Sequence, residues 1–173
     1  MVAGLHNGLS NDFSAETAKD PMHQPIESIL IQAESRFLKP DELNQLKVYL
    51  HSWPERQGAY QSLRDQEASL VQQTLNQLER DRPDLSAPLL EICQKDLLLI
   101  LRQSAMAMLM TDEGLLQERA IAWIEDQLQM YPLQTAYEAM IRILNAQLKH
   151  QLGSQEMELI RPYMTQVQVA LLV

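Results

Sequence analysis

From Ile26 to the C-terminus, apolar residues recur at intervals of three and four, and prolines or short polar breaks separate one series from the next. These intervals line one side of an α-helix, whereas a half-buried strand needs strict alternation of apolar and polar residues. No alternating, β-branched run of any length occurs, and the 5 glycines are too few for the loops of a strand-rich fold. The pattern predicts an all-α fold of about seven to eight helices joined by short turns.

Two of these apolar series lead up to a proline. They are Leu43, Leu46, Leu50 and Trp53, ahead of Pro54, and Leu116, Ala120, Trp123, Ile124 and Leu128, ahead of Pro132. A helix with one apolar stripe normally turns that stripe toward the core. We therefore expect Trp123 to be buried.

Residues 1–24 differ from the rest of the chain, because glycine, asparagine and proline leave room for only one short helix, at residues 12–19. We predict that residues 1–24 form a mobile N-terminal arm. Residues 25–173 are long enough to bury a core of their own, and we predict that they form one domain.

The composition excludes several classes of function. A net charge of −9 disfavours binding to nucleic acid or to an anionic membrane surface, since both require concentrated Lys and Arg. No stretch approaches the ~18 apolar residues that span a bilayer, and the N-terminus lacks the basic and apolar regions of a secretory signal. The chain has 1 cysteine and thus no internal disulfide framework. We expect a cytoplasmic protein.

The common patterns of enzymes are missing from the sequence. It contains no glycine-rich phosphate loop, no Gly-x-Ser-x-Gly segment and no pair of histidines at i, i+4. We therefore expect neither enzymatic activity nor a metal site of its own. Of the four histidines, His51 or His150 could ligate a haem iron, although a surface position near a helix end fits either of them better.

The single cysteine, Cys93, lies three residues before Asp96 in the most apolar of the expected helices. This spacing puts both side chains on one face. A buried carboxylate needs hydrogen-bond donors, and the pyrrole nitrogens of a tetrapyrrole would supply them, while the thiol bonds to the pigment and Lys95 holds a propionate. In the alternative interpretation, Cys93 is a small buried apolar residue and Asp96 faces solvent near a helix N-terminus.

Met106, Met108 and Met110 alternate along the same helix and so cover more than one of its faces. Flexible filling of the core is the simpler explanation for them. A broad, soft pocket for a large planar ligand is the other, and Met106 is then a candidate contact of the cofactor.

From about residue 26 onward the chain resembles the allophycocyanin and phycocyanin family of cyanobacterial phycobilisome proteins. The landmarks, in order, are Ala33-Glu34-Ser35-Arg36-Phe37-Leu38, Pro40 with Glu42-Leu43, Arg82-Pro83-Asp84, Cys93-x-x-Asp96 with Leu101-Arg102, Asp112, Glu125 to Pro132, and Pro162-Tyr163-Met164. The resemblance implies a globin-like core with a helical N-terminal extension. It also implies a phycocyanobilin-like bilin on Cys93, whose inner nitrogens bond to Asp96.

The resemblance also implies a surface for subunit pairing. Gln32 stands where the family has an acidic residue that pairs with an arginine of the partner, and Arg102 matches that basic position. Phe37 stands where a tyrosine is common. These three residues are the candidate interface, and a homodimer is one form of pairing that it allows. Other differences lie near the pigment helix, where Lys95 replaces an arginine and the loop between Asp84 and Cys93 is short.

These observations leave three hypotheses. The first is a bilin-carrying protein in or beside the phycobilisome, at the cytoplasmic face of the thylakoid, with antenna subunits as partners. The second is a globin-related protein that binds haem or free bilin and works with the proteins of bilin biosynthesis. The third is a pigment-free relative that keeps the fold and the pairing surface.

Overall fold

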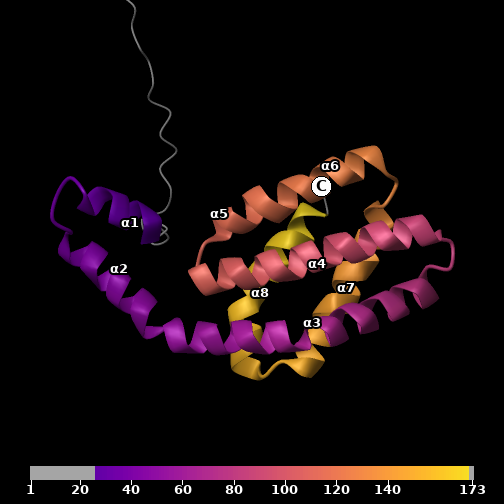
Figure 1. Cartoon of the computed structure of the whole chain (residues 1–173), viewed down its shortest axis with the longest axis horizontal. Helices are drawn as coiled ribbons and strands as arrows, with labels where there is room; N and C mark the ends of the chain where they lie inside the picture. The colour runs from indigo at the N-terminus through magenta and orange to yellow at the C-terminus, as the bar shows by residue number, and fades with distance from the viewer. Residues whose placement is uncertain (1–25, 172–173) are drawn as a thin grey trace, which may run out of the picture. The chain divides into compact units, whose positions relative to one another are not determined.

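The computed structural model describes residues 26–171, with the side chain of residue 27 left out (Figure 1). The predicted arm at residues 1–24, with its short helix at residues 12–19, lies outside the described residues. The chain divides into two compact units, Met1–Leu38 and Lys39–Val173. Each unit is treated by itself below, and the boundary predicted at residue 25 stays a prediction.

The all-α prediction is confirmed, and the described range contains no strand. The first unit holds α1 (Ile26–Ala33). The second unit holds α2 (Pro40–His51), α3 (Trp53–Asp81), α4 (Ala87–Met110), α5 (Glu113–Leu116), the π-helix η1 (Gln117–Ile121), α6 (Ala122–Met130), α7 (Gln134–Gln151) and α8 (Ser154–Ala170). The turn α5, the π-helix and α6 follow one another without a break, so the π-helix is an insertion within one longer helix.

The helix boundaries follow the proline and capping signals of the sequence. Pro40, Pro54 and Pro88 lie in the first two positions of α2, α3 and α4, where a missing backbone N–H costs nothing. At the other end of α4, Thr111 adopts the left-handed conformation with φ 54° and ends the helix. Asp112 then accepts a hydrogen bond from the backbone N–H of Leu115 at 3.2 Å and starts α5.

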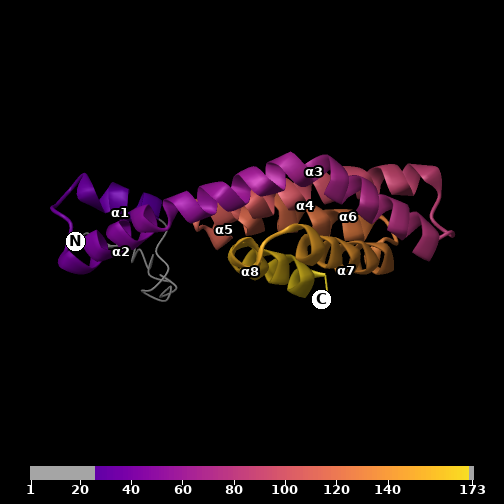
Figure 2. The same cartoon turned by 90° about the horizontal axis from the view of Figure 1, so that it is seen from below.

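The core of the second unit lies between two layers of helices. Figure 2 shows α3 and α4 on one side and α7 and α8 on the other, and α3 contacts α4, α7 and α8. The α5–α6 segment runs along α4 (Figure 1). Side chains with no exposed surface fill the space between these helices, among them Leu70, Leu78, Leu97, Ile100, Leu144 and Ile160. Their burial supplies the main stabilising free energy of the unit.

The prediction that Trp123 is buried is wrong, because 49% of this residue is exposed. The buried side of η1 and α6 is centred on Ala120, Ile124 and Gln127. Trp123 is 100° around the helix from Ile124, at the edge of that side. The stripe of α2 is also largely uncovered, since Leu43 is 52% and Leu50 is 61% exposed.

Among the residues that the structure describes, Arg56 is the largest fully buried side chain, with 1% of the residue exposed. Its guanidinium donates to the backbone oxygens of Tyr49, at 2.6 Å, and of Leu109. It also lies over the ring of Tyr49, 4.1 Å from the centroid. The contact with Leu109 uses a carbonyl near the end of α4, where the helix dipole is negative. Arg56 thus connects the junction of α2 and α3 to the C-terminal end of α4.

Replacing this arginine tests the connection. We expect Arg56→Met to lower the free energy of unfolding by about 3 kcal/mol, because it leaves buried carbonyls without their donor. The free energy of unfolding is measured by urea denaturation, with circular dichroism as the signal. Arg64→Met is the matched control on the same helix, since its side chain is 62% exposed, and it should change stability by no more than about 0.5 kcal/mol. Equal losses in the two variants would contradict the assigned role.

Candidate functional site

Cys93 and Asp96 both point into the interior from the first half of α4. Cys93 has no exposed surface and Asp96 is 4% exposed. They share their side of the helix with Leu97 and Ile100, which are also fully buried. A thiol and a carboxylate one helical turn apart therefore lie within the core.

The carboxylate of Asp96 accepts hydrogen bonds from two aromatic side chains of other helices. The hydroxyl of Tyr137, on α7, donates to Oδ2. The indole Nε1–H of Trp123, on α6, donates to Oδ1 at 3.0 Å. Both carboxylate oxygens thus have a donor, as a buried charge requires. Sequence reasoning identified Asp96 but missed both donors, which are 27 and 41 residues further along the chain.

The two donors differ in their access to solvent. Tyr137 has no exposed surface, whereas Trp123 is about half exposed. Burial raises the pKa of the Tyr137 hydroxyl, and its hydrogen bond to Asp96 raises that pKa further. Tyr137 therefore keeps its proton and remains a donor. Trp123 forms the outer boundary of the cluster, between the carboxylate and solvent.

The thiol of Cys93 is a weak nucleophile in this environment. Burial raises its pKa from 9.0 to about 11, and the negative charge of Asp96 contributes in the same direction. The positive charge of Arg82 acts in the opposite direction but is a smaller effect. At neutral pH the sulfur is therefore almost entirely protonated, and the thiolate is the reactive form.

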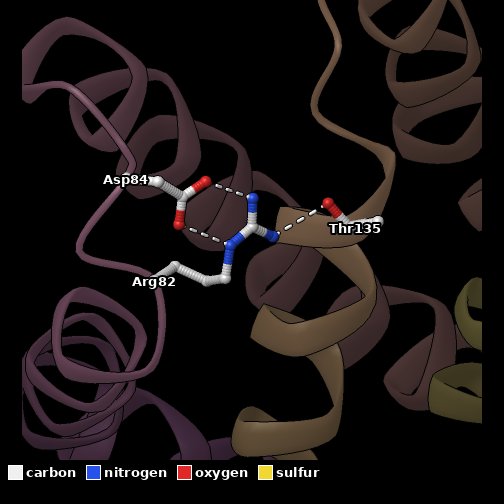
Figure 3. Close-up of polar contacts among 3 residues, drawn as sticks. All are labelled: Arg82, Asp84 and Thr135. Atoms are coloured by element: carbon white, nitrogen blue, oxygen red, sulfur yellow. Dashed lines mark hydrogen bonds and ion pairs between the residues drawn. The ribbon is translucent and has the colours of Figure 1, made fainter.

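Arg82 holds the loop in front of α4 against α7 (Figure 3). Its guanidinium makes a two-pronged contact with Asp84, with distances of 2.9 and 2.7 Å, and donates to Oγ1 of Thr135 at 2.8 Å. Thr135 is in the first turn of α7, two residues before Tyr137. The Arg82-Pro83-Asp84 segment thus positions the start of α4 close to the helix that supplies Tyr137 to Asp96.

The other residues predicted for the pigment site lie elsewhere. Lys95 is exposed on α4, 200° around the helix from Cys93. Met106 is partly buried and lines a separate pocket of about 360 Å³, together with Tyr60, Arg102 and Arg119. The structure thus brings Cys93 and Asp96 together with Trp123 and Tyr137, and it does not bring Lys95 or Met106 to them.

The predicted interface residues fall in both units. In the first unit, the side-chain oxygen of Gln32 accepts a hydrogen bond from Arg36, and Phe37 is 99% exposed. In the second unit, Arg102 makes a two-pronged ion pair with Glu67 of α3, both distances being 2.7 Å. The charge of Arg102 is therefore balanced within its own chain.

The two histidines considered as haem ligands lie at the surface. His51 and His150 are both exposed, on α2 and α7. Over residues 26–171 there is no group of three or more side chains suited to hold a metal ion. In the same range, no helix combines the length and the apolar character needed to cross a membrane.

Comparison with known proteins gives two matches. The family model described as phycobilisome protein matches residues 30–171, which include every helix from α2 to α8. A protein of Nostoc sp. (strain PCC 7120) described as "Putative allophycocyanin subunit alpha 2" is 30% identical over 131 residues, which are 70% of this chain and 80% of that protein.

The matched family consists of all-α, globin-like proteins that generally bind pigments and do not act as enzymes. The helices described above agree with that fold, including the N-terminal extension that the resemblance implied. The match extends over most of the chain and includes both Cys93 and Asp96. On these findings, the chain belongs to the phycobilisome protein family.

Proposed function

We propose that this protein carries a linear tetrapyrrole, a bilin, covalently on Cys93 and works in or beside the cyanobacterial light-harvesting antenna. The observation that supports this proposal is the donor set around Asp96. The carboxylate already accepts one N–H from an aromatic ring, that of Trp123. A pyrrole N–H has the same chemistry, and the sulfur of Cys93 lies one helical turn away on the same side of α4.

The hydrogen-bonding atoms of Asp96 fit such a group once the indole of Trp123 moves, and the sulfur of Cys93, which has no exposed surface, must in addition be uncovered. Trp123 is half exposed, so its indole can turn outward without opening the core, and Oδ1 of Asp96 then becomes free to accept another N–H. Tyr137 is fully buried and would stay on Oδ2. When bound, the bilin would supply light absorption, and the protein would supply a sulfur anchor, a negative charge and a rigid wall.

The protonated state of Cys93 indicates that the bilin does not attach efficiently without a second protein. A buried thiol with a pKa of about 11 reacts slowly by itself at neutral pH. We infer that a partner protein which delivers the bilin also loosens the start of α4 and exposes the sulfur. Such a partner would belong with the proteins of bilin biosynthesis and attachment.

Exposed apolar side chains support assembly with other phycobilisome subunits. In the first unit, Ile31 is 59% and Phe37 is 99% exposed. In the second unit, Val48 and Leu50 of α2 are 62% and 61% exposed. Exposed apolar side chains of this kind are suited to a protein interface. Family membership implies such assembly, and we propose that it takes place at the cytoplasmic face of the thylakoid, with antenna subunits or a second copy of the chain as the partner.

One observation favours a second function, that of a pigment-free subunit. Cys93 is fully buried, and both oxygens of Asp96 have donors from the protein itself. A buried carboxylate whose two oxygens both have donors from the protein needs no ligand to satisfy it. In that case Asp96, Trp123 and Tyr137 only hold α4, α6 and α7 together, and the protein acts through its exposed apolar side chains.

The first prediction concerns the covalent bond. Produced together with a bilin-synthesis pathway, the protein should give a band that fluoresces with zinc on a denaturing gel. Cys93→Ser should lose this band completely, because a hydroxyl does not replace the thiolate in bond formation. Ser104→Ala, at another buried position of α4, is the control and should keep it.

The outcomes of this experiment separate the three hypotheses. A colourless wild-type protein would exclude bilin attachment and support the pigment-free subunit. A Soret band that appears on addition of haem, without covalent bilin, would support the tetrapyrrole-handling hypothesis instead.

The second prediction concerns the carboxylate. In pigment-carrying protein, Asp96→Asn should broaden the red absorption and shift its maximum, because the change removes the negative charge that stabilises the protonated pigment. Trp123→Phe is the control, since it removes an N–H donor but leaves that charge, and its spectrum should stay close to wild type. An Asp96→Asn spectrum identical to that of wild type would exclude the role assigned to the carboxylate.

The third prediction concerns the reactivity of the free thiol. Since burial raises the pKa of Cys93 from 9.0 to about 11, the thiolate fraction near pH 8 should be about a hundredfold lower than in the unfolded chain. The rate of alkylation by iodoacetamide, measured by mass spectrometry, should therefore reach half its maximum near pH 11 in buffer, whereas in urea it should do so near pH 9. Equal rates in buffer and in urea would contradict the burial of Cys93.

A further inference from the structure

A groove of about 640 Å³ runs between α7 and α8, and its lining does not include Cys93, Asp96 or their hydrogen-bond partners. Figure 2 shows these two helices side by side. On α7 the groove is lined by Arg142, Lys149 and His150, at spacings that keep them on one face. On α8 it is lined by Met157, Arg161 and Met164, also on one face.

The groove combines an apolar floor with a basic rim. Met157 is 7% and Met164 is 1% exposed, so both belong to the bottom of the groove. Arg142, Lys149 and Arg161 are exposed residues of the rim. Among the described residues that line the groove there is no aspartate or glutamate, although the whole chain carries a net charge of −9.

The dipole of α7 does not account for this arrangement. Lys149 and His150 are in the last turn of the helix, where a positive charge offsets the negative end of the dipole. Arg142, however, is about two turns earlier, and Arg161 is on the opposite wall. The basic residues therefore all lie along the groove, and they are not confined to the end of one helix.

These cations remain available to a ligand. Arg161 pairs with Glu158, but both side chains are more than half exposed. Arg142 is 3.8 Å from Asp81, and its side chain is 71% exposed. Exposed ion pairs of this kind contribute little to stability and exchange easily. Among the described residues, Lys149 has no ion pair.

We propose that the groove between α7 and α8 binds an amphipathic organic anion. Its apolar body would lie on Met157 and Met164, and its acidic group would lie among Arg142, Lys149 and Arg161. The volume is within the range of about 300–1,000 Å³ that is typical of small-molecule sites. This proposal does not depend on the bilin proposal, because the two sites share no residue.

The test uses 8-anilinonaphthalene-1-sulfonate, a fluorescent aromatic anion, as the probe for the full-length protein. Its emission should rise and shift to the blue, with saturation at one probe per chain, and its affinity should fall as NaCl is added. N-phenyl-1-naphthylamine has the same rings without the sulfonate, and it should bind more weakly by about tenfold.

Two double variants assign the signal to the groove. Lys149→Gln with Arg161→Gln should weaken binding of the sulfonate by about tenfold. Lys47→Gln with Arg80→Gln, which removes the same charge outside the groove, should stay within about twofold of wild type. Near-ultraviolet circular dichroism checks that each variant is folded. Absence of saturable binding, equal affinity for the neutral probe, or equal losses in the two variants would overturn the proposal.

Discussion

A buried carboxylate, that of Asp96, determines how three helices of the second unit fit together. A negative charge in an apolar core is tolerated only if hydrogen-bond donors reach it. Here α6 supplies the indole of Trp123 and α7 supplies the hydroxyl of Tyr137. The register of α4 against both helices therefore has to bring this carboxylate within reach of both donors. Because Trp123 is half exposed, this polar cluster also extends from the core to the surface, which makes it suited to receive a ligand.

Arginines belonging to α3 or directly following it hold both ends of α4. Arg56 donates to the backbone near the C-terminal end of α4, and Arg82 fixes the loop in front of its N-terminal end through Asp84 and Thr135. The last carbonyl groups of a helix have no hydrogen-bond donor within the helix. A guanidinium has five N–H donors, so one arginine can bind several oxygens at such a helix end or in a loop. Both ends of the helix with the candidate attachment site are thus held by arginines, and the contacts of Arg82 are the ones that have to be released before the start of α4 can loosen.

Much of the fold could be predicted from the sequence, but less of the candidate site could. The prolines and the apolar intervals predicted an all-α chain, and the spacing of Cys93 and Asp96 put them on one face of a helix. The hydrogen-bond donors of Asp96 were missed, because nothing in the local sequence of α4 indicates which side chains of α6 and α7 will face it. The prediction that Trp123 is buried fails for a related reason. Its place in an apolar series indicates burial, but the sequence does not show that its indole N–H donates a hydrogen bond.

The local sequence therefore accounts for where helices begin and end and which side of each is apolar, because propensity, proline and periodicity act over a few residues. Two other features do not follow from the local sequence. Asp96 contacts Tyr137, 41 residues away, and Arg142 and Arg161 line the same groove. They depend on how whole helices pack, and that packing is set by contacts between segments distant in the chain.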